Sequence, residues 1–472
     1  MHAKTLAVLL ILALLPKYLY AQTDWPQFRG PASNPTSEND NLPEEWGPDH
    51  NIEWSSELPG RGWSSPIVVR NRVFLTTVVT DGQSKSPQAG TDYSNEYVAE
   101  LTKQGLSGEE VMQKVQERDF ELPDEVDVHY WLYCLDVESG EVLWKDEFHA
   151  GKPQGGRHRK NSFASETPVS DGEQVYVYSA NLGLFAYDLD GKQSWNTKLH
   201  AYPIYLEFGT GSSPALHDGL VIIVNDNEES AFIAAFDTKD GSEVWRTLRK
   251  PAEVKSAQGP VPKSGWVTPF VWKNDLRAEI ITLQPGVAIS YDTTGRELWR
   301  LGGMTVAPAA SSFAHGEYLI LDGGKRSAMF AVKPGASGEI KSAGDDKSEF
   351  VQWVAPRTGT YIPTPVAYLD GIYVLDDKAI ITKLDPTTGK QVYKHRLGSS
   401  GATITSSPWA YNGKVFCLSE QGDTYVLQAG DEYKLLGVNS LDDFTMASPA
   451  ISGDRLLLRT EKTLYSIRRQ VP

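Results

Sequence analysis

The residues best suited to chemistry in this sequence are a few oxygen donors that stand beside apolar runs. Glu166 directly precedes a Thr-Pro pair, and Asn225 and Asp226 follow the apolar run 221–224. Carboxylate and amide oxygens of this kind are ligands that Ca²⁺ takes in proteins. The same pattern is typical of a polar hairpin loop at residues 225–229 and of a solvated position at Glu166. This second interpretation is favoured, so we predict no metal site.

Basic and aromatic residues form a second set of candidates, in this case for binding. Residues 157–160 are a basic run that could bind an anionic ligand, a glycan or the acidic tail of a partner, although such runs are commonly solvated loops. Two further loops carry an arginine or an aromatic residue shortly before a proline. The candidate binding residues are Arg61, Trp63, Arg157, His158, Lys160, Glu166, Asn225, Asp226 and Arg357.

Motifs of common catalytic sites are absent from the sequence. There is no His-Glu-x-x-His, no Cys-x-x-Cys, no Gly-x-Ser-x-Gly and no phosphate-binding glycine loop. The 9 histidines include no pair at the spacing of metal ligands within one strand or helix. We therefore assign no catalytic residue.

The composition favours many short strands and disfavours a nucleic-acid partner. The chain has 13 Trp, 21 Tyr and 41 Gly among 472 residues, which suits strands joined by tight turns. Its net charge is −16, with no basic stripe to neutralise the phosphates that dominate nucleic-acid affinity. Cys134 and Cys417 each lie in an apolar, strand-like run, so we expect buried free thiols.

The first 21 residues predict export. A short polar start with Lys4 is followed by an apolar run at residues 6–15, which is too short to span a bilayer, and residues 19–21 offer a cleavage site. The alternative is an uncleaved membrane anchor. No other segment is apolar enough to cross a membrane, so we expect a periplasmic or secreted mature chain that begins near Gln22.

Eight copies of one motif decide the fold class. A small residue followed by proline recurs along the chain, and most copies precede an Asn-Gly- or Asp-Gly-type turn and an apolar strand, which is a strong hairpin signal. The prolines are Pro66, Pro168, Pro214, Pro269, Pro308, Pro365, Pro408 and Pro449. Apart from the first interval, their spacing is that of a propeller blade. We therefore predict an all-β, eight-bladed propeller of four-stranded antiparallel blades over residues 51–472.

Within these repeats an Asp, a Gly turn and an aromatic residue recur at fixed spacing. The Asp lies at the mouth of a tight hairpin, and the ring lies on the next strand, where it can pack against the neighbouring blade. Blades five and seven have lost most of this motif. The predicted blade-docking residues are Trp54, Trp144, Trp195, Trp245, Trp299 and Tyr393.

The eighth copy ends after three strands, and residues 51–58 near the N-terminus have the pattern of the missing fourth. A strand from the N-terminus that completes blade eight would remove two open sheet edges, which are an aggregation liability. Residues 22–50 then precede this closing strand, and we expect them to wrap the surface in an extended form, with Trp46 peripheral.

The long first interval contains an insertion at residues 81–129. Ser107 and Glu110 form a capping box, and an earlier helix is expected to end at Gly105. We predict a helical hairpin that lies over one face of blade one.

The Asp-x-x-x-Gly-x-x-x-Trp hairpins resemble the pyrroloquinoline quinone (PQQ)-type propeller repeat, over residues 51–468. Residues 24–31 resemble the start of exported bacterial PQQ-like propellers. In such proteins the Trp rings dock between blades. Two kinds of relative matter: quinoprotein dehydrogenases, which bind PQQ and Ca²⁺, and the outer-membrane assembly lipoprotein BamB, which is a non-catalytic scaffold.

The dehydrogenase resemblance implies more than this sequence supplies. Those enzymes usually carry an adjacent Cys-Cys pair near the quinone and extra loops that cover it, whereas Cys134 and Cys417 stand far apart. We therefore expect no cofactor, with PQQ and Ca²⁺ possible but unsupported. The favoured function is a non-catalytic binding or scaffold protein of the cell envelope, which presents one propeller face to a protein or polysaccharide partner. The alternative is a PQQ- and Ca²⁺-dependent periplasmic dehydrogenase of alcohols or sugars.

Overall fold

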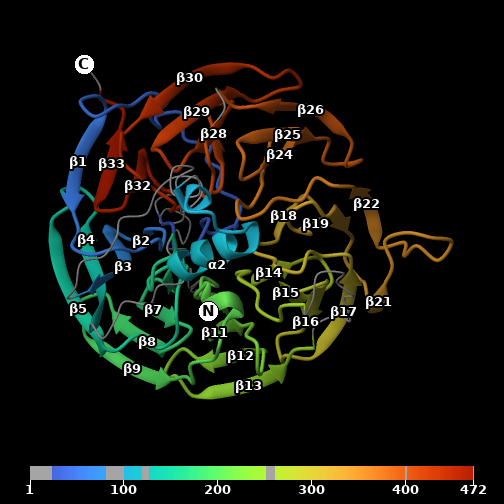
Figure 1. Cartoon of the computed structure of the whole chain (residues 1–472), viewed down its shortest axis with the longest axis horizontal. Coiled ribbons are helices and arrows are strands. Elements are labelled where there is room, and N and C mark those ends of the chain that lie inside the picture. Colours follow the sequence, from blue (N-terminus) through green and yellow to red (C-terminus); the bar gives the residue numbers. More distant parts are fainter. Residues whose placement is uncertain are drawn as a thin grey trace, which may run out of the picture.

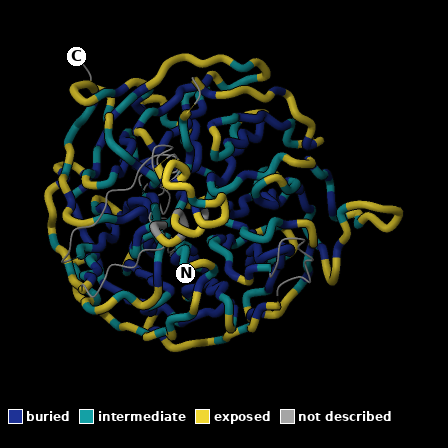
Figure 2. The backbone as a smooth tube through the Cα atoms, in the orientation of Figure 1, coloured by how far each residue is buried: buried dark blue, intermediate teal, exposed yellow. Residues whose placement is uncertain are grey.

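Eight β-sheets stand around a central channel in the computed structural model, which describes residues 24–80, 100–119, 127–158, 160–250, 261–398 and 401–470. Figure 1 shows the sheets arranged as blades of a ring, with the first strand of each blade near the centre. Figure 2 shows buried backbone in the body of the blades and exposed backbone around the rim. The predicted all-β, eight-bladed propeller is confirmed.

Strands follow one another from the channel outward in the first four blades. Blade one consists of β2 (Ile67–Val69), β3 (Arg72–Thr80), β4 (Val128–Asp136) and β5 (Val142–Gly151), and blade two of β6 (Val169–Ser170), β7 (Gln174–Ser179), β8 (Gly183–Asp188) and β9 (Gln193–Lys198). Blade three consists of β10 (Ala215–His217), β11 (Leu220–Asn225), β12 (Phe232–Asp237) and β13 (Glu243–Leu248), and blade four of β14 (Phe270–Lys273), β15 (Ala278–Gln284), β16 (Val287–Tyr291) and β17 (Glu297–Gly302). A short 3-10 helix, η1 (Tyr205–Glu207), precedes blade three.

The second half of the ring repeats this order. Blade five consists of β18 (Phe313–His315), β19 (Tyr318–Asp322), β20 (Met329–Val332) and β22 (Val351–Ala355), and blade six of β23 (Val366–Tyr368), β24 (Gly371–Leu375), β25 (Ile380–Leu384) and β26 (Gln391–Arg396). Blade seven consists of β27 (Trp409–Tyr411), β28 (Lys414–Leu418), β29 (Asp423–Gln428) and β30 (Leu435–Ser440), and blade eight of β31 (Ala450–Ser452), β32 (Arg455–Arg459), β33 (Thr463–Arg468) and β1 (Ile52–Glu57).

The N-terminal strand closes the ring, as predicted. β1 pairs antiparallel with β33, from Ile52 opposite Ile467 to Glu57 opposite Thr463. Glu53 holds this junction through short contacts to Arg455 (2.6 Å) and Arg468 (2.8 Å). Because each blade of a closed ring has a neighbour on both sides, no sheet face in the ring lacks a packing partner.

Tryptophans on outermost strands lie against the glycine turn of the following blade. Trp54, Trp144, Trp195 and Trp245 each donate from Nε1 to a backbone carbonyl of that turn at 2.9–3.0 Å. A Cβ added to the turn glycine would come within 2.4–2.7 Å of the ring in each case, so only glycine leaves room. The turn glycine also has a positive φ, a backbone conformation that glycine adopts without strain because it has no Cβ.

Blade five departs from the pattern, with consequences for two tryptophans. Its third and fourth strands are separated by β21 (Gly338–Ile340), which pairs parallel with β17 as a fifth strand of blade four. Blade five therefore offers no glycine turn to Trp299, which is fully buried and donates to Glu279 of its own blade. Trp353, which the sequence did not single out, docks instead on Gly389 of blade six and donates to the Pro386 carbonyl at 2.9 Å.

The start of blade five was predicted at Ala307-Pro308, and this is wrong. Ser311 and Ser312 occupy the place of the small residue and proline, and β18 begins directly afterwards. The position requires a hydroxyl group, which Ser311 supplies and Ala307 lacks. Tyr393, the docking residue predicted for blade six, lies buried between blades six and seven beside Tyr433.

The segment before β1 takes a different path from the expected surface wrap. It crosses the channel and bonds to inner strands on both sides, through Trp25 to Val68 and through Thr36 to Ala410. Arg29 is buried there and donates to the carbonyls of Thr364 (2.8 Å) and Pro365 (2.6 Å). Trp46 is also buried, stacked on Phe416, so the expectation of a peripheral Trp46 is wrong.

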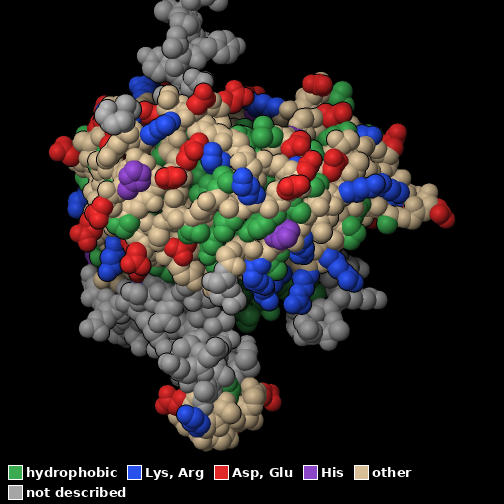
Figure 3. All heavy atoms as spheres, turned by 90° about the horizontal axis from the view of Figure 1, so that it is seen from above, with side chains coloured by type: hydrophobic (Ala, Val, Ile, Leu, Met, Phe, Trp, Pro, Cys, Tyr) green, Lys and Arg blue, Asp and Glu red, His purple; other side chains and the backbone are tan. Residues whose placement is uncertain are grey.

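The insertion connects the second and third strands of blade one. β3 and β4 pair as far as Thr80 opposite Val128, and α2 (Gly108–Asp119) lies beyond them. The predicted capping box is present: Ser107 Oγ accepts from Glu110 N at 3.3 Å, and Glu110 Oε2 accepts from Ser107 N at 2.7 Å. α2 lies over the centre of the ring in Figure 1. Figure 3 shows that acidic and basic side chains alternate over the edge of the ring.

Other expectations concern termini, thiols and membrane segments. The predicted signal peptide at residues 1–21 lies outside the described residues. Cys134 and Cys417 are buried free thiols in blades one and seven, as expected, and burial raises the pKa of Cys134 to about 12. Within the described ranges, no helix has the length and hydropathy needed to cross a bilayer.

Candidate binding face at the mouth of the channel

A ring of hydroxyl residues surrounds the channel where the inner strands begin. In seven successive pairs of blades, the backbone N–H of the residue that opens one blade donates to the hydroxyl of the equivalent residue in the next, at 2.9–3.3 Å. The members are Ser65, Thr167, Ser213, Thr268, Ser311, Thr364, Ser407 and Ser448. We call these eight residues the hydroxyl ring. It explains why a small hydroxyl residue recurs before the proline.

The eighth junction, where the two ends of the chain meet, is held differently. Arg459 of β32 donates to the carbonyl and the hydroxyl of Ser64, at 2.9 and 2.7 Å. Burial lowers the pKa of the Arg459 guanidinium to about 9. An added Cβ at Gly62 would come within 2.5 Å of this guanidinium, so the loop before β2 needs glycine there.

The hydroxyl ring lies in a cavity of about 490 Å³ at the centre of the propeller. Aromatic side chains from loops before four different blades line it, and Phe28 of the N-terminal segment lines it as well. The loop aromatics are Trp63, Phe208, Trp266 and Tyr361. We call this cavity the channel pocket. The pocket therefore combines flat apolar surfaces with many polar hydrogen-bonding groups.

The basic run predicted at residues 157–160 forms part of the rim of this pocket. Lys160 reaches the buried carboxylate of Glu420 in blade seven at 2.8 Å, and Thr405 donates to the same oxygen at 2.6 Å. The indole of Trp63 donates to the Lys160 carbonyl at 2.7 Å. His158 packs edge-on against Phe208. Arg159 lies outside the described residues. The run is thus fastened to the rim and is no free solvated loop.

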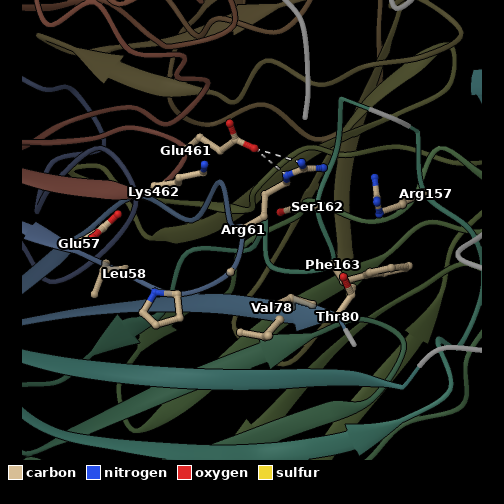
Figure 4. A pocket seen from close by; sticks show the side chains of 13 residues that line it. Glu57, Leu58, Arg61, Val78, Thr80, Arg157, Ser162, Phe163, Glu461 and Lys462 are labelled. Atoms are coloured by element: carbon tan, nitrogen blue, oxygen red, sulfur yellow. Dashed lines mark hydrogen bonds and ion pairs between the residues drawn. The ribbon is translucent and has the colours of Figure 1, made fainter. Parts of the chain in front are cut away.

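Arg61 and Arg157 line a second cavity of about 550 Å³, beside blades eight and one (Figure 4). Arg61 forms an ion pair with Glu461 at 3.0 Å. Burial, reinforced by repulsion from Arg61, lowers the pKa of Arg157 to about 10. The Arg157 guanidinium also lies 5.4 Å from the centre of the Phe163 ring. We call this the side pocket. Thr80, the last residue of β3, also lines it.

The three oxygen donors considered as Ca²⁺ ligands lie near one another but are engaged by protein groups. Both carboxylate oxygens of Asp226 bind Arg249, at 2.8 and 3.2 Å. Glu166 accepts from Thr210 at 2.5 Å, and Asn225 Oδ1 accepts from Asn227 at 2.8 Å. Burial raises the pKa of Glu166 and raises that of Asp226 to about 6. Asp226 is thus neutralised by a buried guanidinium and offers no free charge to Ca²⁺, whereas Glu166 and Asn225 each accept protein hydrogen bonds through one oxygen.

Other predicted residues are separate from this cluster. Arg357 lies exposed in a loop on the mouth side, with a left-handed φ of 57°, and does not line the channel pocket. Across the described part of the chain, no three His, Cys, Asp or Glu side chains are grouped as metal ligands would be. Cys134 and Cys417 do not line the channel pocket either, and Met446 is the sulfur-containing residue among its described lining.

Sequence reasoning missed several lining residues. Phe208, Trp266 and Tyr361 each stand a few residues before a member of the hydroxyl ring, as Trp63 does, and this shared position was the available signal. Phe28 and Arg29 lie in the stretch 24–31 that resembles the start of exported PQQ-like propellers, but no repeat position placed them in the channel, because this segment precedes the first blade.

Comparisons with known proteins agree with this architecture. Residues 129–300, in blades one to four, match the family described as outer membrane protein assembly factor BamB. The solved structure of BamB from Moraxella catarrhalis is similar with a TM-score of 0.51 and 11% identity, covering 71% of this chain and 91% of BamB. A search of curated protein sequences finds no significant match.

Two quinohemoprotein alcohol dehydrogenases are also similar in fold. The enzyme from Comamonas testosteroni has a TM-score of 0.60 and 12% identity, covering 95% of this chain and 81% of the enzyme. The enzyme from Pseudomonas putida HK5 has a TM-score of 0.56 and 12% identity, covering 95% and 82%. At such identities the likeness concerns the fold alone.

Proposed function

Because the chain is a PQQ-type, BamB-like β-propeller, we propose that it is a non-catalytic binding protein of the cell envelope, whose channel-mouth face receives a protein or polysaccharide partner. The observation that carries this proposal is the channel pocket, which is lined by aromatic rings and hydroxyl groups and bordered by loops from several blades. Loops on a rigid scaffold are where binding sites concentrate.

The charged groups around the mouth support binding rather than catalysis. Lys160 is paired with Glu420, Arg61 with Glu461 and Asp226 with Arg249, so each has a structural task. A general base needs a carboxylate or imidazole that reaches the reacting group, and the imidazole that lines the channel pocket, His158, is packed against Phe208. The three oxygen donors that a dehydrogenase could have used are engaged by Arg249, Thr210 and Asn227.

Placement in the envelope rests on the N-terminal sequence. Expression in a bacterial host with its natural N-terminus is expected to yield periplasmic protein that begins at Gln22. Fractionation followed by N-terminal sequencing measures this. Full-length protein retained in the membrane would support the anchored alternative.

Site-specific photo-crosslinking tests the proposed face. A photoreactive amino acid at Arg357, which is exposed on the mouth side, is expected to capture an envelope component in cells. The same group at Glu173, exposed in the turn between β6 and β7 at the opposite end of the ring, serves as the matched control. Equal capture from both positions, or capture from Glu173 alone, would refute the proposed face.

The alternative function, a PQQ- and Ca²⁺-dependent dehydrogenase, is tested by cofactor binding and enzyme activity. Calorimetry with PQQ and Ca²⁺, followed by dye-linked oxidation of alcohols and aldose sugars, is expected to show neither cofactor binding nor turnover. Turnover that is abolished by Glu166→Ala would replace the binding proposal with the enzyme.

A further inference from the structure

The N-terminal segment crosses the channel beside the channel pocket. It is bonded to inner strands of blades one and two through Trp25 and Pro26, and of blades six and seven through Asn34 and Thr36. Phe28 of this segment lines the pocket. A polymer therefore has no straight path through the ring, and an occupant that enters from the mouth must end inside it.

The hydroxyl ring selects for an occupant rich in hydrogen-bond acceptors. A hydroxyl has one donor and two acceptor sites, and in seven members the oxygen already accepts a backbone N–H. Among the described residues, none of these seven hydroxyls donates its own proton to a protein acceptor. An apolar occupant would displace water and leave these hydroxyl protons without an acceptor. Each such group would weaken binding by about 1–3 kcal/mol.

The aromatic lining adds a second requirement, for flat apolar surface on the same occupant. Trp63 and Trp266 are oriented by their indole N–H groups, which donate to the carbonyls of Lys160 at 2.7 Å and Gly209 at 2.8 Å. The rings are thus anchored at one edge. Phe208 contacts Trp266, with ring centres 6.2 Å apart, so the two form one apolar wall.

The pocket carries little selection for charge. Lys160, the lysine that lines it, is paired with the fully buried Glu420. No Asp or Glu lines the pocket in the described chain. An anionic occupant would therefore compete with an existing carboxylate for Lys160, and a cationic one would find no counter-ion in the lining.

We propose that the channel pocket binds the end of a neutral saccharide chain. A sugar ring has a flat C–H face that packs on aromatic rings, and its edge carries oxygens that accept from hydroxyl donors. About 490 Å³ lies within the range of about 300–1,000 Å³ that is usual for small-molecule sites. This inference rests on the proposed function, since it names the partner chemistry for the same face. An aromatic peptide side chain would satisfy the rings but leave the hydroxyl protons unpaired.

The test begins with a neutral-glycan array and continues by calorimetry with maltotriose, cellotriose and triacetylchitotriose. At least one neutral glycan is expected to bind with one site per chain. Trp266→Ala is expected to reduce the affinity by about tenfold or more, as loss of a central aromatic contact does. Trp131→Ala, at a half-buried tryptophan of blade one outside the pocket, is the matched control and is expected to bind as the wild type does.

Two further variants keep the test independent of folding. Thr268→Val removes one donor of the hydroxyl ring with almost no change in shape, and Trp266→Phe keeps an aromatic ring; melting curves check that both fold. We expect weaker binding from the first and partial retention from the second. Two labelled forms of the bound glycan, each with a bulky fluorophore on a different terminus, are then compared. We expect the label to abolish binding when it is on the terminus that enters the pocket and to be tolerated on the other.

Several outcomes would overturn this inference. They are the absence of binding by any neutral glycan, binding that survives Trp266→Ala, binding that tolerates the fluorophore at both termini, and competition by PQQ for the same pocket. Capture of an envelope protein from Arg357 without any glycan binding would leave the proposed face in place and refute the saccharide. The two proposals therefore fail separately.

Discussion

Lys160, in the loop before blade two, forms an ion pair of 2.8 Å with Glu420 of blade seven. Blades eight and one stand between these two blades, so a single contact links distant parts of the channel rim. The carboxylate is fully buried and the ammonium nearly so. A buried charge that loses its partner is costly, whereas exposed pairs contribute little.

Replacement of Lys160 by Met is therefore expected to destabilise the protein by about 3–5 kcal/mol, because the fully buried carboxylate of Glu420 would lose the ion pair of 2.8 Å with Lys160. The double variant with Glu420→Gln should recover much of the loss. Lys152→Met breaks an exposed pair with Asp127 and should change stability by less than about 1 kcal/mol. Denaturant titration measures all three, and equal effects of the two single lysine variants would contradict the role of the rim pair.

Glycine turns beneath the docking tryptophans give a second prediction. Gly295→Ala would place a Cβ 2.4 Å from the Trp245 ring, whereas Gly172→Ala, also at positive φ, meets nothing within 4 Å. Both variants strain the backbone, but only the first also displaces the partly buried ring of Trp245. We expect Gly295→Ala to cost about 1–3 kcal/mol more than Gly172→Ala. Thermal melting of the two proteins side by side checks this difference.

Deletion of tryptophans tests whether the N-terminal segment belongs to the core. Trp245→Ala is expected to cost about 3–5 kcal/mol. Trp46→Ala should cost a similar amount, because Trp46 is 4% exposed, stacks on Phe416 and belongs to the same hydrophobic core as the inner strands of blades one, seven and eight. A cost at Trp46 below about 1 kcal/mol would show that the segment before β1 is only loosely attached.

Two N-terminal truncations distinguish the role of β1, which closes the ring, from that of the segment before it, which crosses the channel. A chain that begins at Pro59 lacks β1, so the edge of β33 is unpaired, and we expect aggregation and loss of a cooperative transition. A chain that begins at Asp49 keeps β1 but lacks the segment across the channel, and should fold with lower stability. Circular dichroism melting and size-exclusion chromatography distinguish the two. If the Pro59 chain melts as sharply as the mature protein, closure by β1 is not required.

Asp322 gives a prediction on pH. It is buried, accepts from Gly324 N at 2.8 Å and from the Thr360 hydroxyl at 2.8 Å, and burial raises its pKa to about 6. A carboxyl whose pKa is higher in the folded than in the unfolded state stabilises below its unfolded pKa, and this contribution is lost as pH rises through the folded pKa. Relative to Asp322→Asn, the wild type should therefore lose on the order of 3 kcal/mol between pH 4 and pH 7. A pH-independent difference between the two would contradict a raised pKa.

The sequence by itself determined the ring. The recurring pairs of a small residue and proline, the Asp–Gly–Trp hairpins and the missing last strand predicted eight blades and their closure, because each is a local pattern set by turn geometry and strand pairing, although Ala307-Pro308 misplaced the start of blade five. The capping box at Ser107 and Glu110 was readable for the same reason. Trp299 was predicted to dock on the next blade and Trp353 was not singled out, because β21 separates the third and fourth strands of blade five and changes which turn faces which ring.

Only the tertiary structure decided what the channel contains. The hydroxyl ring links residues about one blade apart in sequence, Lys160 meets Glu420, and Arg29 reaches Thr364, and no local pattern encodes such meetings. They depend on ring closure, which brings the start of every inner strand to one axis and leaves the N-terminal segment to cross it. For that reason the candidate Ca²⁺ ligands could be named from the sequence, whereas their engagement by Arg249, Thr210 and Asn227 could be seen only in the folded chain.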